Sequence, residues 1–194
     1  MIALYDYGAG NIHSLAKGLE AGGARVRITD QWNEALDADA LVLPGVGAFG
    51  AVSLDNRRVR EALEAELPCL GICLGMQLLL SESEEASGEG IGRIPGVVRR
   101  LQAKTIPQMG WNDVEAGDDP LLEGLGTFSA YYANSFVCQV EDPEVVVAST
   151  TYERDRFPAV IRRGWTWGVQ FHPEKSSEAG LRLLANFIRI VEER

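Results

Sequence analysis

Cysteine and histidine are scarce in this sequence of 194 residues, which contains three cysteines and two histidines. An odd and small number of cysteines argues against a framework of disulfides. A zinc site needs about four suitably spaced ligands, and neither CxxC nor HxxxH spacing occurs. We therefore expect no disulfide, no bound metal and no cofactor.

Long apolar segments are also absent. No run approaches the roughly 20 residues that a membrane-spanning helix needs. The first residues, "MIALYDYGAGN", have no basic region and reach glycine too early for a signal peptide. We expect a cytoplasmic protein that does not enter a membrane.

Positive charge is in deficit, with 18 Lys and Arg against 28 Asp and Glu, a net charge of −10. Nonspecific binding to nucleic acid or to an anionic membrane rewards a basic face, so we expect neither partner. The apolar content of 46% and the length suit one globular domain over residues 1–194.

The first half of the chain alternates strand-like and helix-like segments. Strands are predicted at 2–7, 25–29, 40–44 and 68–72, and helices at 12–23, 31–38, 54–67 and 74–83. In helix 54–67, Val59, Leu63 and Leu67 share one face. Repeated β-then-α order implies right-handed crossovers, and therefore an α/β fold with a central, mostly parallel sheet flanked by helices.

The second half has a different pattern. A polar, glycine-rich stretch at 81–96 predicts a surface loop. Short strands follow at 97–101, 108–115, 127–133, 135–140, 145–150, 158–163 and 166–171, with a helical turn near "DPLLEGL". An amphipathic helix is expected over 176–192. This half predicts a mixed or antiparallel extension of the sheet.

The segment Gly71-Ile72-Cys73-Leu74-Gly75 has the G-x-nucleophile-x-G form of a nucleophile elbow. A nucleophile between a strand and a helix often sits in strained backbone and needs small neighbours. The helix N-terminus favours a thiolate, and the N–H of Leu74 is free to face an oxyanion. From this stretch alone a buried core thiol is an equally good interpretation of Cys73.

The other two cysteines have no such context. Cys69 lies inside a predicted strand and Cys138 in a late one, so core packing is favoured for both.

A catalytic cysteine needs a base, and His172 is the better of the two histidines. It follows an apolar strand, and strand ends are where a doubly wound sheet exposes its site residues. Glu174 is close enough to orient the imidazole and stabilise its charged form. A surface histidine beside a helix-capping acid is the alternative for "HPE" alone. His13 is interpreted as a packed or surface residue.

The stretch "VLPGVGAFG" (42–50) places Gly45 and Gly47 just past a predicted strand. Backbone N–H groups in this loop could face the elbow and complete an oxyanion hole. A simple tight turn is the alternative.

Together, G-I-C-L-G-M-Q and the downstream F-H-P-E resemble the class I glutamine amidotransferase family. The resemblance implies a flavodoxin-like fold and a Cys-His-Glu triad that hydrolyses glutamine to glutamate and ammonia. Cys73 would be the nucleophile, His172 the general base and acid, and Glu174 its orienting partner. Gln77 would hold the substrate, and Gly45, Val46, Gly47 and Leu74 would serve the oxyanion region.

Four motifs, "DYGAGN", "PGVGAFG", "QMGWN" and "FHPEKSS", are similar to the branch of this family that provides the glutaminase subunit of imidazole glycerol phosphate synthase. That resemblance spans residues 6–177 and implies a heterodimer with a (β/α)8-barrel cyclase, which receives the ammonia for histidine biosynthesis. It assigns Asn11, Trp111, Tyr131 and Lys175 to the interface. For Asn11 a helix cap remains a close alternative.

The chain departs from the resemblance at two positions. Asn134 stands where the branch usually has a histidine, so any role of that histidine is not carried over. Val46 replaces a glycine of many relatives, and a β-branched residue resists positive φ. We therefore predict that the isolated chain is a poor glutaminase and that the partner with its ligand activates it.

Two other functions are kept as alternatives to this prediction. The chain could be the glutaminase of another amidotransferase, for anthranilate, guanylate or pyridoxal phosphate. It could also be a non-catalytic redox or scaffold protein of related fold.

Overall fold

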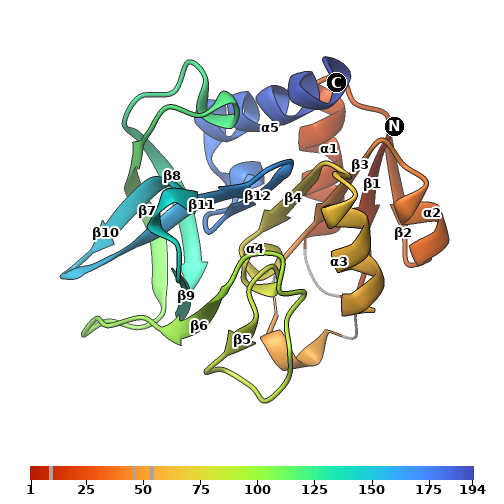
Figure 1. Cartoon of the computed structure of the whole chain (residues 1–194). Helices are drawn as coiled ribbons and strands as arrows, with labels where there is room; N and C mark the ends of the chain where they lie inside the picture. The colour runs from red at the N-terminus through yellow and green to blue at the C-terminus, as the bar shows by residue number, and fades with distance from the viewer. Residues whose placement is uncertain (9–10, 46, 53–54) are drawn as a thin grey trace.

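The computed structural model describes residues 1–8, 11–45, 47–52 and 55–194. Its main sheet is built from β1 (Ile2–Tyr5), β2 (Val26–Thr29), β3 (Ala40–Leu43), β4 (Cys69–Ile72), β7 (Gln108–Ala116), β8 (Phe128–Asn134), β10 (Val146–Tyr152), β11 (Asp155–Arg163) and β12 (Thr166–Val169). Within the described residues these strands lie in the order β2-β1-β3-β4-β12-β11-β10-β7-β8 (Figure 1).

Helices and short 3-10 turns connect the strands. The α-helices are α1 (Ile12–Ala21), α2 (Trp32–Leu36), α3 (Asn56–Glu64), α4 (Leu74–Leu78) and α5 (Ser177–Glu192). The 3-10 turns are η1 (Phe49–Ala51), η2 (Pro120–Leu122), η3 (Pro143–Val145) and η4 (Pro173–Lys175). Turn η2 lies inside "DPLLEGL", as predicted, whereas η1 and η3 were not anticipated.

The strands of the first half pair in parallel, which confirms the predicted parallel sheet. β1 pairs with β2 and β3, and β4 pairs with β3 and β12. Side chains alternate between two buried clusters: Leu70 and Ile72 belong to one and Cys69 to the other. Burial of both faces explains why these strands read as continuous apolar runs.

From β12 onward the sheet is antiparallel, as predicted for the second half. β11 pairs antiparallel with both β12 and β10, and β7 with both β10 and β8. A smaller sheet contains β5 (Glu82–Ser83), β6 (Gly96–Arg100) and β9 (Phe136–Val140), in the order β5-β6-β9.

Two predictions around residue 80 were wrong. The helix expected over 74–83 ends at Leu78, and the expected loop over 81–96 begins with strand β5. The carbonyls of Leu78 and Leu79 accept hydrogen bonds from the N–H groups of Ile91 and Ile94, rather than from a next helical turn. Long-range partners for these carbonyls therefore end the helix early.

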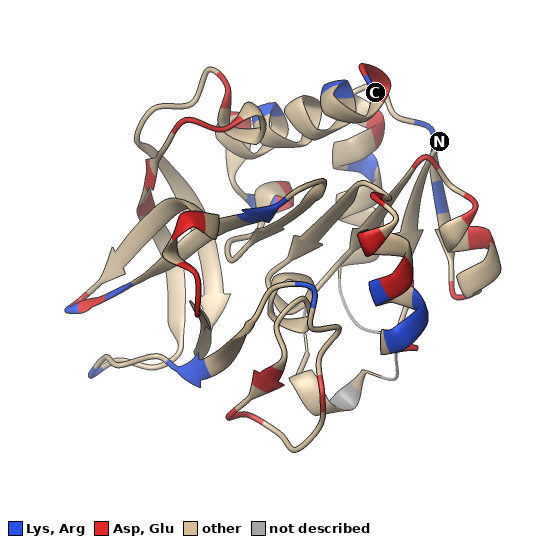
Figure 2. Cartoon of the chain, viewed as in Figure 1, with Lys and Arg blue, Asp and Glu red and all other residues tan. Residues whose placement is uncertain are grey.

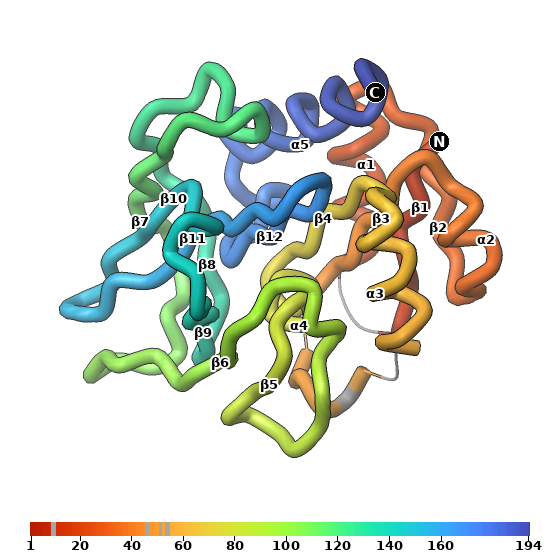
Figure 3. Tube along the Cα trace, viewed as in Figure 1, coloured from red at the N-terminus to blue at the C-terminus, as the bar shows by residue number. Residues whose placement is uncertain are grey.

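Helices cover both faces of the parallel half (Figure 1). α1 and α5 bury apolar side chains such as Leu15 and Phe187 in one cluster, and α3 buries Val59 and Leu63 in the other. Leu67 lies beyond the end of α3, half-buried against the second cluster. The two chain ends lie close together beside α5 (Figure 3).

Lys and Arg are interspersed with Asp and Glu over the helices and loops in the view of Figure 2. In the part of the chain that the structure describes, no helix combines the length and apolar content needed to cross a membrane. Cys69 and Cys138 are fully buried, which confirms their interpretation as core residues, and His13 is exposed on α1.

Candidate active site

Cys73 occupies a sharp turn between β4 and α4. Its φ of 50° and ψ of −102° are strained for a non-glycine residue, and its N–H donates to the Val169 carbonyl at 2.7 Å. A β-carbon on Gly71 would lie 2.6 Å from the carbonyl oxygen of Gly75, and one on Gly75 would lie 2.0 Å from that of Leu43. Only glycine fits at either position, so the predicted tight turn is confirmed.

The loop after β3 passes directly against this turn. A β-carbon on Gly45 would come within 2.4 Å of the Leu74 nitrogen and 2.3 Å of the Ile72 carbonyl oxygen. Gly47 has a φ of 132° and lines the same pocket as Cys73. Val46, on which the predicted need for activation rests, lies outside the described residues.

His172 lies shortly after β12, which ends at Val169 and is the parallel neighbour of β4. The register pairs Val169 with Ile72, so the carboxyl ends of adjacent strands bring His172 toward Cys73. The Nδ1 atom of His172 lies 3.0 Å from Oε1 of Glu174, and both side chains are buried. The structure therefore brings together the three residues predicted as a triad.

The surroundings of His172 favour its charged form. Burial lowers the pKa of His172, but the nearby Cys73 and Glu174 side chains favour the charged imidazole more strongly and raise the pKa to about 9. Because Nδ1 is engaged by Glu174, the buried Nε2 atom, which lacks a hydrogen bond, is the nitrogen left for chemistry. A histidine in this state can donate a proton to a leaving group.

A cavity of about 280 Å³ opens onto Cys73. It is lined by Gly47, Cys73, Leu74, Gln77, Glu85, Pro107, Met109, Ala133, Asn134, Ser135 and Phe136. A larger cavity of about 760 Å³ lies beside Trp165 and Arg162. Its lining contains neither a cysteine nor a histidine, so we place the chemistry in the smaller one.

Gln77 lines the smaller cavity, as the resemblance implies. Its Nε2 donates to the Phe136 carbonyl at 3.1 Å and to Oε1 of Gln170 at 3.4 Å. Gln170 is fully buried, and its own Nε2 lies 3.6 Å from the Cys73 sulfur. We did not predict Gln170. A lone amide in the apolar run "WGVQF" was the signal that could have found it.

Glu85 was also missed. Its Oε2 accepts a hydrogen bond from the Phe49 N–H at 2.8 Å, and the residue lines the Cys73 cavity. It stands among other acids in "SESEE", so nothing in the sequence distinguishes it from a solvated charge. Across the described ranges, no three His, Cys, Asp or Glu side chains gather in a way that could hold a metal ion.

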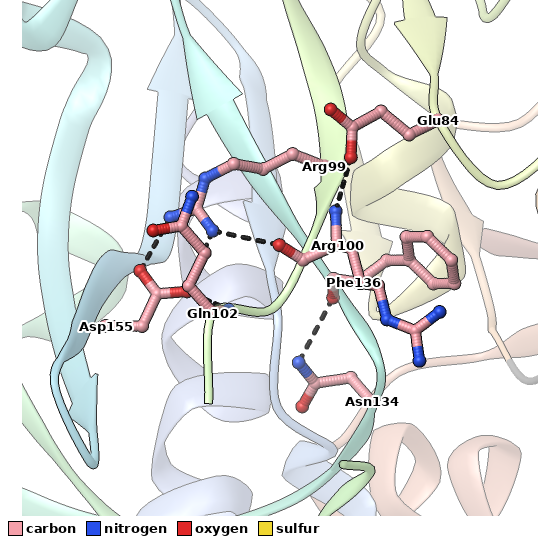
Figure 4. A network of polar contacts seen from close by, with 7 residues as sticks. All are labelled: Glu84, Arg99, Arg100, Gln102, Asn134, Phe136 and Asp155. Carbon is pink, nitrogen blue, oxygen red and sulfur yellow. Dashed lines mark hydrogen bonds and ion pairs between the residues drawn. The ribbon is translucent and has the colours of Figure 1, made fainter. Parts of the chain in front are cut away.

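Asn134 lies in the wall of the same cavity. Its Nδ2 donates to the Phe136 carbonyl at 3.1 Å, while its buried Oδ1 has no partner (Figure 4). Beside it, Arg99 binds Asp155 through two hydrogen bonds, and the N–H of Gln102 donates to the same carboxylate (Figure 4). This network ties β6 to β11 and so supports β9, which carries Phe136.

Three of the four predicted interface residues meet on the outer side of β7 and β8. Trp111 pairs with Tyr131 across the strands, with ring centroids 6.2 Å apart and edge-on packing. The Lys175 ammonium lies 5.6 Å from the Tyr131 ring centroid. Trp111 is 55% exposed and nearby Met109 is 67% exposed. We call Met109, Trp111, Tyr131 and Lys175 the aromatic face.

Asn11, the fourth predicted interface residue, is exposed at the N-cap position of α1. The position is the one that the helix-cap alternative predicts, but the Asn11 side chain makes no capping hydrogen bond.

Comparison with known proteins agrees with this geometry. The family model described as "Glutamine amidotransferase class-I" matches residues 3–191. Imidazole glycerol phosphate synthase subunit HisH of Symbiobacterium thermophilum is 46% identical, over 98% of this chain and 94% of that protein. The subunit of the same name from Halobacterium salinarum is 44% identical, over 96% of this chain and 92% of that protein.

Solved structures share the fold. The structure of PurLQS from Thermotoga maritima superposes with a TM-score of 0.79 at 18% identity, covering 97% of both chains. A crystal structure described as glutamine amidotransferase gives a TM-score of 0.76 at 20% identity, covering 99% of this chain and 100% of the other. Given the full-length match to the family model, this chain belongs to the class I glutamine amidotransferase family.

Proposed function

We propose that this chain is the glutaminase subunit of an imidazole glycerol phosphate synthase and supplies ammonia for histidine biosynthesis. The observation that carries the proposal is the strained Cys73 turn beside the buried His172–Glu174 pair, at the wall of a small cavity. Relatives named as this subunit, 40–46% identical over at least 96% of the chain, support the choice of synthase.

The chemistry begins with the Cys73 thiolate, whose proton has passed to His172, attacking the side-chain carbonyl carbon of glutamine. The C–S bond forms as the carbonyl becomes a tetrahedral oxyanion, which faces the N–H of Leu74 and the loop at Gly45 and Gly47. His172 then gives its proton to the departing nitrogen. The C–N bond breaks, and ammonia and a glutamyl thioester result.

Water completes the cycle. His172, now neutral, takes a proton from a water molecule as the water oxygen attacks the thioester carbon. The C–S bond breaks, and glutamate leaves. Glu174 remains the charged partner of Nδ1 throughout, which holds the imidazole in one orientation and stabilises its protonated form.

Glu85 and Gln77 suit recognition of the amino-acid end of glutamine. The Glu85 carboxylate lines the cavity and is held by the Phe49 N–H, so it can meet an ammonium group. Gln77 lines the same cavity. We propose both as substrate-binding residues.

We further propose that a (β/α)8-barrel cyclase docks on the aromatic face, with Asn11 at its margin. Exposed tryptophan and tyrosine are the residues that most often dominate the energy of an interface. Among the described residues, Met109 and Trp111 are the most exposed large apolar side chains. Met109 also lines the Cys73 cavity, so this face and the chemistry share a wall.

Glutamine labelled with ¹⁵N at its amide tests the proposal. Incubated with this chain, a barrel cyclase and the cyclase's nucleotide substrate, it should deliver ¹⁵N into imidazole glycerol phosphate. Mass spectrometry of the product measures the transfer. If all of the ¹⁵N appears as free ammonia, in an amount equal to the glutamate formed, transfer to this partner is contradicted. Equal transfer of ¹⁵N to the product of an anthranilate or guanylate synthase would favour another amidotransferase.

The same assay tests activation by the partner. Glutamate formation should rise at least about tenfold when the cyclase and its nucleotide ligand are added, if the loop around Gly45 and Gly47 must be biased toward its donating state. Equal rates of glutamate formation with and without the partner would contradict the activation hypothesis. A glutamine-mimicking electrophile that labels Cys73, and is blocked by glutamine, separates an enzyme from a redox or scaffold protein.

A further inference from the structure

A chain of amide groups runs through the buried interior and ends at the Cys73 sulfur. It starts at the Phe136 carbonyl, passes through Gln77 and then Gln170, and reaches the sulfur at 3.6 Å. Gln77 is 5% exposed, Gln170 is fully buried and Cys73 is 7% exposed. The mechanism derived above does not use Gln170.

The Phe136 carbonyl fixes which group donates and which accepts in each hydrogen bond of this row of amides. A backbone carbonyl only accepts, so the Gln77 atom facing Phe136 is its amide nitrogen. That same nitrogen faces Gln170, and two nitrogens cannot share a hydrogen bond here because both only donate. Gln170 therefore turns its carbonyl oxygen toward Gln77 and its N–H toward Cys73.

We propose that Gln170 is a further catalytic residue, whose N–H donates a hydrogen bond to the Cys73 sulfur and stabilises its thiolate. This inference rests on the proposed function, because it takes Cys73 to be the nucleophile. A donor aimed at a charged acceptor favours the charged form, and the effect is strong where water is excluded. Gln77 and the Phe136 carbonyl act as positioning groups, since they fix which end of the Gln170 amide meets the sulfur.

A purely structural role for Gln170 makes a different prediction. If the amide served only to satisfy buried polar groups, its loss would lower the free energy of unfolding and leave the reactivity of the thiol unchanged. The two roles are therefore separated by the pH dependence of thiol reactivity.

The test measures the rate of Cys73 alkylation by iodoacetamide from pH 5 to pH 10, in the complex of this chain with its cyclase. Cys69 and Cys138 are fully buried, so alkylation of the folded chain reports on Cys73. The variants are Gln170→Met, which keeps the length but removes the N–H, and Gln170→Glu, which places oxygen at the sulfur. Gln139→Glu, on the exposed side of β9, is the control for added charge.

We expect the pH of half-maximal alkylation to rise by about one unit in Gln170→Met and by more in Gln170→Glu. At pH values well below that midpoint, such a shift corresponds to alkylation about tenfold slower or more. Glutamine hydrolysis should show a lower kcat with KM nearly unchanged. Gln139→Glu should match the wild-type chain in both assays.

An unchanged alkylation profile in a folded Gln170→Met complex would overturn the proposal, whatever happens to kcat. If both Gln170 variants fail to fold, Gln77→Met decides, because it leaves Gln170 in place but frees its amide to turn. The proposal requires a profile shifted in the same direction, and an unshifted one rejects it. Alkylation needs no turnover, so these outcomes are independent of whether glutamine is the substrate.

Discussion

The Cys73 turn and the aromatic face differ in how tightly the surrounding structure determines them. At the turn, Gly71, Gly45 and Gly75 leave no space for a single added carbon, and the side chains proposed as catalytic are buried. On the aromatic face, Trp111 and Met109 are mostly exposed. The proposed nucleophile thus lies where close packing fixes the backbone, whereas the side chains suited to binding a partner are exposed to solvent.

The two regions are nevertheless joined by short contacts. The His172 N–H donates to the Tyr131 carbonyl at 2.9 Å. The buried Ser176 hydroxyl donates to the His172 carbonyl at 2.6 Å and accepts from the Tyr131 N–H at 2.9 Å. A partner that presses on β8 therefore acts on the same backbone that holds the proposed general acid.

Removing the proposed nucleophile should have the largest effect and is the strongest test of the contrast between the Cys73 turn and the aromatic face. Cys73→Ala should lower glutamine hydrolysis by about 10³-fold or more, with the fold and partner binding retained, because only the attacking atom is lost. Glutamate release and the circular dichroism spectrum provide the two measurements. Cys138→Ala, a buried cysteine in β9, serves as the matched control and should keep most activity. A folded Cys73→Ala protein with substantial activity would remove Cys73 from the mechanism.

Uncoupling His172 from its carboxylate should have the next largest effect. Glu174→Gln keeps the shape but removes the charge that favours the protonated imidazole, so kcat should fall by about 100-fold with a smaller change in KM. Steady-state kinetics of glutamate formation measure this. Wild-type kcat in this variant would show that the 3.0 Å contact between the two side chains has no catalytic role.

The same pair predicts how stability depends on pH. The folded-state pKa of His172 is about 9, above the ordinary histidine value of 6.5, so the folded chain holds this proton more tightly than the unfolded chain. The stabilisation is complete below about pH 6.5 and is lost as the pH rises through 9. Urea unfolding at pH 6 and pH 10 should show a decrease of about 2 kcal/mol that is absent in His172→Gln. An equal decrease in both proteins would assign it to other groups.

The aromatic face should respond in affinity and not in chemistry. Trp111→Ala should weaken binding of the cyclase by about tenfold or more. The fold should stay intact, because an exposed tryptophan contributes little to the stability of the unbound chain. Titration calorimetry measures the affinity. Leu181→Ala, on exposed α5, removes a comparably exposed apolar side chain and should bind normally. Matching losses in the two variants would mean that the cyclase does not use this face.

Much of this contrast could be predicted from the sequence. Alternating apolar segments indicated the parallel half, and the glycine spacing around Cys73 indicated the turn, because each feature is local. The resemblance assigned Trp111 and Tyr131 to one interface, but their pairing across β7 and β8 was not predicted, since antiparallel register leaves no local sign in the sequence. The early end of α4 depends on hydrogen bonds from Ile91 and Ile94, which no window around residue 80 contains.

The two site residues that were not predicted could not be found from the sequence for the same physical reason. Gln170 is a candidate because its amide contacts the Cys73 sulfur, and Glu85 because its carboxylate accepts a hydrogen bond from the Phe49 N–H. Both partners are far away in the sequence. Periodicity reports which face a side chain occupies and not what that face meets. Long-range contacts of single polar groups are therefore the part that required coordinates.

The place of β12 in the sheet has a consequence for protein synthesis. Among the strands that the structure describes, β12 comes last along the chain, yet it lies in the middle of the sheet, between β4 and β11. A nascent chain that has emerged only as far as Arg163 carries Cys73 but has neither the Val169 carbonyl that anchors the turn nor His172. A chain interrupted before β12 is complete therefore lacks two of the contacts on which the proposed catalytic site depends.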